Sequence, residues 1–389
     1  MTATILDVAR EAGVSRGTAY LVLRASPLVA NRTHAHVQRT IHRLGNQPNQ
    51  LAAGLRSKRS HILGLVVSDL TYPHYAQMAV GIEGAVEGAG YSLIVASSRL
   101  AIERERRHVD TLRRYRADGL IITPQDLRAE EVAHLRSLRE EGYPFVCLCR
   151  EVAGLETDFC GTDVYGATRA LVAYLTGELG HQRIAILSGR VANTTNAARI
   201  AGLRDELTAR GQPAPDELVA VDAGVGRPVA ESVRELLARR VAFTALLCVN
   251  DFLALGALGA LARAGLRAPE DISVAGMGGL LPHALPEMTL TTVVDDYRGI
   301  GRAAGELLLR RIDSGRTGAS LPAERRVLPA HSASARLLDL RRTAERCWGR
   351  CRPAHQLPLP RADPDVRHVV FGQAFRLARR RAPAFHTRL

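Results

Sequence analysis

Residues 4–23, with the sequence TILDVAREAGVSRGTAYLVL, predict two short helices separated by a tight turn. Thr4 and Asp7 have the spacing of a capping box, in which each side chain accepts a hydrogen bond from the other residue's backbone N–H. Gly13 supplies the turn, because glycine adopts left-handed backbone conformations without a steric penalty. Ser15 can then cap a second helix. The segment therefore predicts a helix-turn-helix.

A third helix is predicted from about Thr33 to Leu44, where Gly45 ends it. Val37 and Ile41 are four residues apart and Leu44 follows three residues later, so these side chains fall on one face. Three short helices with such faces can share one small core. The pattern fits a DNA-binding module and any other small helical bundle equally well, so the assignment depends on particular residues.

Positive charge gathers at the two ends of the 389-residue chain. Residues 1–60 carry nine Arg and Lys against two Asp and Glu, a net +7, and residues 331–389 carry thirteen against four, a net +9. Residues 61–330 carry thirty against thirty-three, a net −3. A basic module on a slightly acidic body is typical of a protein that binds nucleic acid with one end. A membrane surface would attract the same charge, but we find neither a signal-peptide pattern nor an apolar run of about 20 residues. We therefore expect a cytoplasmic protein associated with the nucleoid.

The first sixty residues resemble the lac-repressor-type (LacI/GalR) family of transcription regulators. The matching segments are Ile5–Ser15, Thr18, Val22-Leu23, Pro48-Asn49 and Leu51-Ala52. In that family the second helix enters the major groove and its early residues meet base edges, as helix-turn-helix geometry requires. The DNA contacts that the resemblance implies for this helix and the residue after it are Ser15, Arg16, Gly17, Thr18, Tyr20, Leu21 and Arg24.

Arg16 is the strongest candidate for reading a base. An arginine can bind guanine through two hydrogen bonds, which is the commonest specific base contact, whereas the alternative is a contact to phosphate alone. The family usually has Val-Ser-Arg where this chain has Ala19-Tyr20-Leu21, and Asn where it has Arg24. We therefore expect its operator preference to differ from that of its relatives.

Residues 49–56 match the family's hinge helix. The resemblance implies that this helix forms on DNA and inserts Leu55 into the minor groove, where an apolar wedge kinks a base step. The implied hinge contacts are Asn49, Ala52 and Leu55. Gly54 costs a helix about 0.5–1 kcal/mol relative to alanine, so this hinge should order less readily than others. The alternative is a plain basic linker.

Beyond residue 61, short apolar runs alternate with helical stretches, which predicts parallel sheets covered by helices. The predicted strands are Ile62–Val67, Ser92–Ala96, Gly119–Ile122, Pro144–Leu148, Arg183–Leu187, Ala245–Val249 and Ile272–Ala275. A segment of this length should divide into two lobes, with a ligand cleft at the carboxyl ends of the strands. We expect the chain to cross between the lobes near Gly161 and near Gly278–Thr292. The fold class is thus an all-α helix-turn-helix module followed by a two-lobed, periplasmic-binding-protein-like α/β domain.

The resemblance continues through this body, in Tyr72–Ala76, Arg199–Gly202, Asn250-Asp251 and Leu290–Val293 among other segments. It implies that a small effector is bound by His74, Tyr75, Asn193, Thr195, Arg199 and Asn250. Tyr75 could stack on a sugar or a base, and Arg199 offers a fork of donors to hydroxyl or carboxylate oxygens. Taken alone, His74 is better explained as a surface or core residue.

One departure from the family bears on the effector. The family commonly has an aspartate where this chain has Gly278, in Met277-Gly278-Gly279. Without that carboxylate, a buried ligand donor would lose about 1–3 kcal/mol. Of the effector classes usual for the family (sugars, sugar derivatives and nucleobases), we therefore expect an acidic or phosphorylated one. The alternative is a degenerate pocket that binds nothing.

The predicted division of the chain is 1–47 helix-turn-helix, 48–60 hinge, 61–330 sensor and 331–389 a disordered Arg- and Pro-rich tail. The predicted function is a transcription regulator, most simply a repressor, that binds operator DNA as a homodimer. We expect no cofactor and no metal, since the six cysteines lack the doubled Cys-x-x-Cys spacing of a zinc site. An enzyme is disfavoured because no nucleophile–base pattern is evident. A solute-binding protein would share the two lobes but would not need the first sixty residues.

Overall fold

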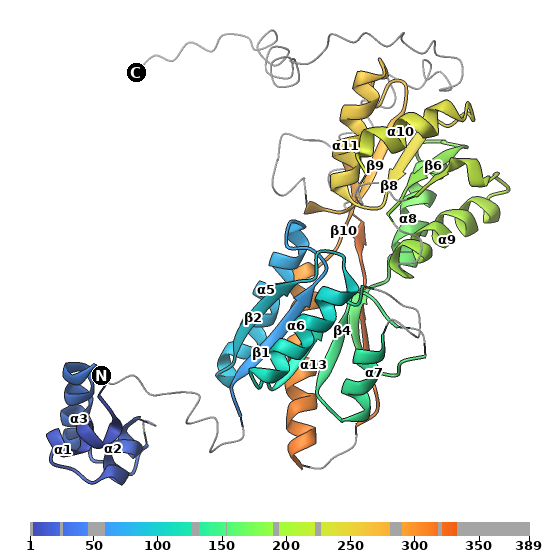
Figure 1. Ribbon diagram of the computed structural model, residues 1–389. Helices are drawn as coiled ribbons and strands as arrows, with labels where there is room; N and C mark the ends of the chain where they lie inside the picture. The colour runs from blue at the N-terminus through green and yellow to red at the C-terminus, as the bar shows by residue number, and fades with distance from the viewer. Residues whose placement is uncertain are drawn as a thin grey trace, which may run out of the picture.

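The computed structural model contains a three-helix domain and two α/β lobes (Figure 1). The structure describes residues 3–23, 26–45, 59–125, 132–152, 154–189, 194–221, 227–280, 290–317 and 321–332. Most of the predicted hinge and nearly all of the predicted tail lie outside these ranges. Among the described residues, no helix is long and apolar enough to cross a membrane.

The first domain consists of α1 (Ile5–Glu11), α2 (Arg16–Leu23) and α3 (Asn31–Leu44). The predicted capping box is confirmed: the Thr4 backbone N–H donates to Asp7 Oδ2 at 2.8 Å, and the Asp7 N–H donates to Thr4 Oγ1 at 3.4 Å. Each helix contributes fully buried side chains to one core, among them Val8, Val22 and Val37. The turn and the shared core follow the sequence prediction.

The first lobe holds a parallel sheet in the order β11-β5-β4-β3-β1-β2. Its strands are β1 (Ile62–Val67), β2 (Ser92–Ser97), β3 (Gly119–Ile122), β4 (Phe145–Leu148), β5 (Asp158–Thr162) and β11 (Arg325–Leu328). Its helices are α5 (Pro73–Val86), α6 (Ile102–Arg114), α7 (Ala133–Glu140), α13 (Tyr297–Thr317) and the 3₁₀ helix η1 (Glu87–Ala89). The side chains of α5 and α13 pack on one face of the sheet, and those of α6 and α7 on the other.

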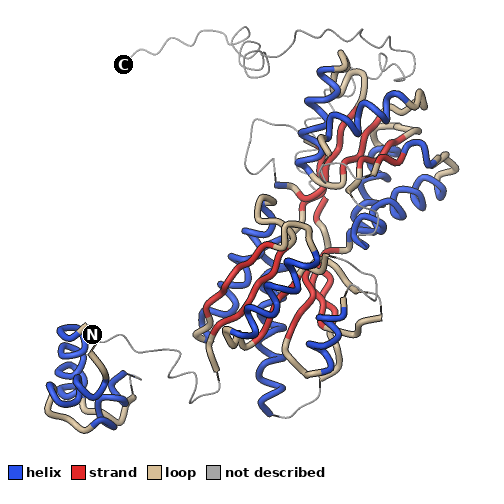
Figure 2. The backbone as a smooth tube through the Cα atoms, in the orientation of Figure 1, coloured by secondary structure: helices blue, strands red, loops and turns tan. Residues whose placement is uncertain are grey.

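The second lobe repeats this plan, with a sheet in the order β12-β10-β9-β8-β6-β7 in which β12 alone is antiparallel. Its strands are β6 (Ile184–Leu187), β7 (Val219–Ala220), β8 (Ala245–Cys248), β9 (Ser273–Gly278), β10 (Thr291–Val294) and β12 (His331–Ser332). Its helices are α8 (Val164–Gly177), α9 (Thr194–Ala209), α10 (Val229–Ala238), α11 (Asp251–Arg263) and the 3₁₀ helix η2 (Asp216–Leu218). In both lobes the strands lie between layers of helices (Figure 2). All seven predicted strands are present.

The chain crosses between the lobes three times. The first crossing follows β5, as predicted near Gly161. The second was predicted within Gly278–Thr292, but β9 and β10 are neighbours in the same sheet, so the crossing comes after Val294. The third, between β11 and β12, was not predicted. Because β12 belongs to the second sheet, the sensor extends at least to Ser332, two residues into the predicted tail.

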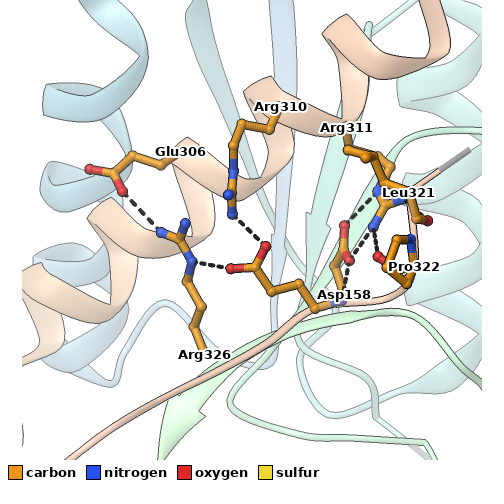
Figure 3. Close-up of polar contacts among 8 residues, drawn as sticks. Asp158, Glu306, Arg310, Arg311, Leu321, Pro322 and Arg326 are labelled. Carbon is orange, nitrogen blue, oxygen red and sulfur yellow. Dashed lines mark hydrogen bonds and ion pairs between the residues drawn. The ribbon is translucent and has the colours of Figure 1, made fainter. Parts of the chain in front are cut away.

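A buried ion pair fixes the third crossing strand to the first lobe (Figure 3). Arg311 on α13 donates to both carboxylate oxygens of Asp158 on β5, at 2.8 and 2.5 Å. The same guanidinium donates to the carbonyl oxygens of Leu321 and Pro322, in the segment leading to β11. The Asp158 side chain is only 1% exposed, so losing Arg311 would leave a buried charge without its partner. This pair joins three elements of the chain at the amino ends of β5 and β11, the end of the first lobe that faces away from the crossings.

Glycines allow α5 and α13 to approach closely. A Cβ atom on Gly81 of α5 would overlap the carbonyl oxygen of Arg298, and one on Gly301 of α13 would overlap that of Met78. The backbones themselves are therefore in contact at this crossing. Neither position has room for any other residue unless the helices separate.

We expect Gly301→Ala to destabilise the protein by about 1–3 kcal/mol, because overpacking forces two well-packed helices apart. Gly84→Ala on α5 is the matched control. Nothing lies within 4 Å of a Cβ atom there, so the free energy of unfolding should rise by about 0.5–1 kcal/mol through helix propensity alone. Urea denaturation of the two variants measures both effects. Equal stabilities would show that the helix crossing tolerates a side chain.

Candidate functional site

The outward face of α2 is built by the turn before it. Ser15 Oγ accepts the Thr18 backbone N–H at 3.0 Å and lies 2.9 Å from the Thr18 hydroxyl, so both side chains are engaged in capping the helix. Ala19 and Val22 point into the core of the domain and are fully buried. These contacts fix which side of α2 faces away from the domain.

Four of the predicted DNA contacts share that outward side. Arg16 and Gly17 are exposed, and Tyr20 and Leu21 are half-buried one turn later. Ser15 and Thr18 flank this side but act mainly as the cap. The other predicted contacts, Arg24, Asn49, Ala52 and Leu55, lie outside the described residues.

A cleft of about 220 Å³ lies between the two lobes, at the carboxyl ends of their strands. His74 and Tyr75 reach it from the start of α5, Thr195 and Arg199 from α9, and Asn250 from the residue before α11. All five were predicted from the sequence. The sixth, Asn193, lies outside the described residues. These residues lie at or near helix starts because, in a parallel sheet of this kind, the chain passes from the carboxyl end of a strand into the next helix.

Internal hydrogen bonds limit what the predicted residues can offer a ligand. The Tyr75 hydroxyl is buried and donates to Ser68 Oγ at 3.0 Å. Asn250 Oδ1 caps α11 by accepting the Leu253 N–H at 2.8 Å, which leaves its NH₂ group as the donor for the cleft. The Thr195 hydroxyl donates to the carbonyl oxygen of Cys149 at 3.1 Å and so links the two lobes.

Aromatic rings line the cleft. His74 stacks on Tyr297 with centroids 5.3 Å apart and lies 4.1 Å from the Tyr75 ring. Tyr72 of the first lobe meets Phe252 of the second edge-on at 6.4 Å. Burial, together with the charges of Arg150 and Arg199, lowers the pKa of His74 to about 3. His74 is therefore a neutral ring at physiological pH and contributes to a stacking surface.

In the described part of the cleft lining, the charged residues are Arg150, Arg199 and Asp295. Sequence reasoning found Arg199 but missed the other two, as well as Tyr297. Asp295 directly follows β10, Tyr297 lies three residues after that strand, and Arg150 lies two residues after β4. The rule that strand ends face the cleft could have found all three, had the boundaries of the strands been known.

The sequence predicted that the cleft lacks a carboxylate because Gly278 replaces the usual aspartate, and the structure corrects this expectation. The Tyr297 hydroxyl lies 2.6 Å from where a Cβ atom of Gly278 would be, so it occupies the space of a side chain at that position. Burial raises the pKa of the nearby Asp295 carboxyl, and Arg199, together with Tyr297 and Thr162, offsets part of that rise. The cleft therefore contains a carboxylate, which comes from another strand.

This arrangement is suited to binding. Cys149 lines the cleft, but burial raises the pKa of its thiol to about 12, so it is not a thiolate nucleophile at neutral pH. Within the described ranges, no group of three His, Cys, Asp or Glu side chains could hold a metal ion. Polar donors, one carboxylate and stacking rings are the groups that orient a small polar ligand.

Two family models match the chain. Residues 4–49 match the model described as bacterial regulatory proteins, lacI family, and residues 173–336 match the periplasmic binding protein-like domain. Among curated proteins, the HTH-type transcriptional regulator AscG of Escherichia coli K12 is 30% identical over 290 residues, which are 74% of this chain and 85% of AscG.

Solved structures agree with the architecture. The lac repressor dimer bound to operator and the anti-inducer ONPF is similar with a TM-score of 0.73 and 26% identity, over 85% of this chain and 97% of that one. The complex of the transcriptional regulator CelR with cellobiose has a TM-score of 0.61 and 29% identity, over 85% of this chain and 98% of that one. Both the helix-turn-helix and the two lobes thus have counterparts in known proteins.

The neutral state of His74 predicts a pH dependence of stability. Its folded pKa of about 3 lies below the ordinary 6.5, so the unfolded chain takes up this proton first as the pH falls. The stabilisation is complete above about pH 6.5 and decreases below it, by about 2 kcal/mol at pH 5. Unfolding in urea at pH 7 and pH 5 should show that His74→Asn loses about 2 kcal/mol less than the unmodified protein. An identical loss in both would contradict this assignment.

Proposed function

Because this chain belongs to the lacI family of bacterial regulatory proteins and is a DNA-binding transcription regulator, we propose that it represses genes by binding their operators through α2. A small effector in the interlobe cleft controls that binding. The observation that carries the proposal is the combination, in one chain, of an outward-facing α2 with an exposed Arg16 and a cleft between two lobes that is lined by charged, polar and aromatic side chains. A solute-binding protein would need only the cleft. The relatives are regulators rather than enzymes, and we assign this chain no catalytic activity.

Within α2, Arg16 reads a base edge while Gly17 lets the helix approach the groove closely. Tyr20 and Leu21 lie one turn further along the same side and extend the contact. The sequence segment 49–56, with Leu55 as the wedge, serves as the hinge that bends the operator. Such a regulator works where the chromosome is, so we place it in the cytoplasm, with the nucleoid.

Operator binding requires two copies of the chain. Half-sites are one helical turn apart, and a two-fold dimer presents two recognition helices at that spacing. Four exposed apolar side chains are suited to a dimer interface: Val80 on α5, Ile94 and Val95 on β2, and Leu255 on α11. Because β2 is also an unpaired edge of the first sheet, a second copy would cover both the edge and these side chains. The relative with the TM-score of 0.73 is itself a dimer.

Helix α13 connects the cleft to the segment that leads to the DNA-binding domain. It begins at Tyr297 in the cleft, and about 24 Å further along, at 1.5 Å per residue, Asp313 accepts a hydrogen bond from Arg59 at 3.0 Å. The neighbouring backbone N–H groups of Ser60 and His61 donate to Asp118. A ligand that shifts the start of α13 would therefore also shift the place where the linker is held.

Arg16→Ala should cost about 1–3 kcal/mol of operator affinity and relax discrimination mainly at one base pair in each half-site. Arg10→Ala, at an exposed position on α1, is the control and should retain the base preference. Selection of bound DNA from a random pool, followed by fluorescence anisotropy at several salt concentrations, measures affinity and preference together. A uniform loss on all sequences, with a shallower salt dependence, would assign Arg16 to phosphate.

A further inference from the structure

We propose that the effector is a small anion that also carries O–H or N–H donors, of which a sugar acid is the simplest example. Arg150 and Arg199 bind its anionic group, and Asp295 accepts hydrogen bonds from its donors. The inference rests on the proposed function, in which this cleft is the effector site, and it specifies the chemical class of the ligand.

Arg199 has few internal partners. Among the described residues, it donates a long hydrogen bond of 3.5 Å to Asn196 Oδ1, and its Nε is buried without a partner. The carboxylate that acts on its charge among the described residues is Asp295, which offsets part of the cost of burying it. A buried donor without a partner is costly, and a bound anion beside Arg199 would relieve that cost.

Arg150 brings a second positive charge from the opposite lobe. Its guanidinium donates to the Pro124 carbonyl oxygen at 2.9 Å, and the described part of the chain gives it no carboxylate partner. Burial lowers the pKa of both Arg199 and His74, and the nearby charge of Arg150 lowers both further. Two guanidinium groups that destabilise each other across a cleft would both gain from an anion between them. Such an anion would also draw the lobes together.

Among the described residues that line the cleft, Asp295 supplies the one carboxylate. Burial raises its pKa, while Arg199, Tyr297 and Thr162 offset part of that rise, and the Tyr297 hydroxyl occupies the space that Gly278 leaves open. With His74 neutral, two arginines and one aspartate give the described lining a net charge of +1. That balance favours a monoanion, and the carboxylate adds a preference for ligands with donor groups.

The size of the cleft limits the ligand further. Its volume of about 220 Å³ is below the range of about 300–1,000 Å³ that is usual for ligand pockets. Stacked His74 and Tyr297 present one flat side, on which a single ring or a short extended chain would lie. A sugar acid of six carbons combines this size with one negative charge and several hydroxyl donors.

Isothermal titration of the full chain compares acidic ligands (D-gluconate, D-glucuronate and glucose 6-phosphate) with neutral D-glucose, D-galactose and D-ribose. We expect at least one acidic ligand to bind about tenfold or more tightly than every neutral one. Arg150→Gln should remove about that factor for the acidic ligand and reduce the affinity for neutral sugars by a much smaller factor. Arg139→Gln on α7, whose side chain is 45% exposed and paired with Glu156, is the control and should change neither.

Three results would overturn the inference: a neutral sugar as the tightest ligand, an acidic ligand that is indifferent to Arg150→Gln, or no binding by any acidic ligand. Operator binding by the same protein separates the two proposals. If a neutral sugar alters operator affinity and no acidic ligand does, effector control stands and the assigned class is wrong. If no ligand binds and operator affinity is unaltered, effector control fails as well.

Discussion

The chain crosses between the lobes at three points, and these three crossings constrain how the two lobes of the sensor can move. The chain leaves the first lobe after β5, returns to it after β10, and leaves it again after β11. Because β5 pairs with β11 and β10 pairs with β12, the crossings are held side by side, and the lobes can only hinge about them. Thr162 and Asp295 lie at these crossings, so the chemistry of the cleft is fixed at the hinge itself. A ligand that binds there contacts the part of the structure on which lobe closure depends.

Helix α13 gives that hinge a rigid extension. Its glycines place it against α5 at backbone distance, and Arg311 ties its far part to β5. Rigid packing of this kind transmits displacement better than a loop would, because packed elements do not deform continuously. Asp313, near its end, binds Arg59 beside the linker. The physical requirement for coupling, a stiff element that touches both sites, is thus met by one helix.

Strong local signals explain what could be predicted from the sequence. The capping box at Thr4, the turn at Gly13 and apolar strands such as Ile62–Val67 each depend on neighbouring residues only. Strands β5 and β11 were missed because their sequences, DFCGT and RRVL, carry charged or small residues and are stabilised by pairing with each other. Family resemblance located His74, Tyr75, Thr195, Arg199 and Asn250. It could not supply Arg150, Asp295 or Tyr297, whose roles depend on where strands end and on the space left by Gly278.

Coupling between the cleft and the operator is best tested by measuring it from both sides. The operator Kd of the full chain is determined with and without saturating D-gluconate, and the gluconate Kd with and without saturating operator. Thermodynamic linkage requires the two ratios to be equal, and allosteric coupling usually amounts to about 5- to 150-fold. Our account predicts equal ratios of at least about fivefold. Gluconate that binds with the same affinity to the free and the operator-bound protein would contradict it.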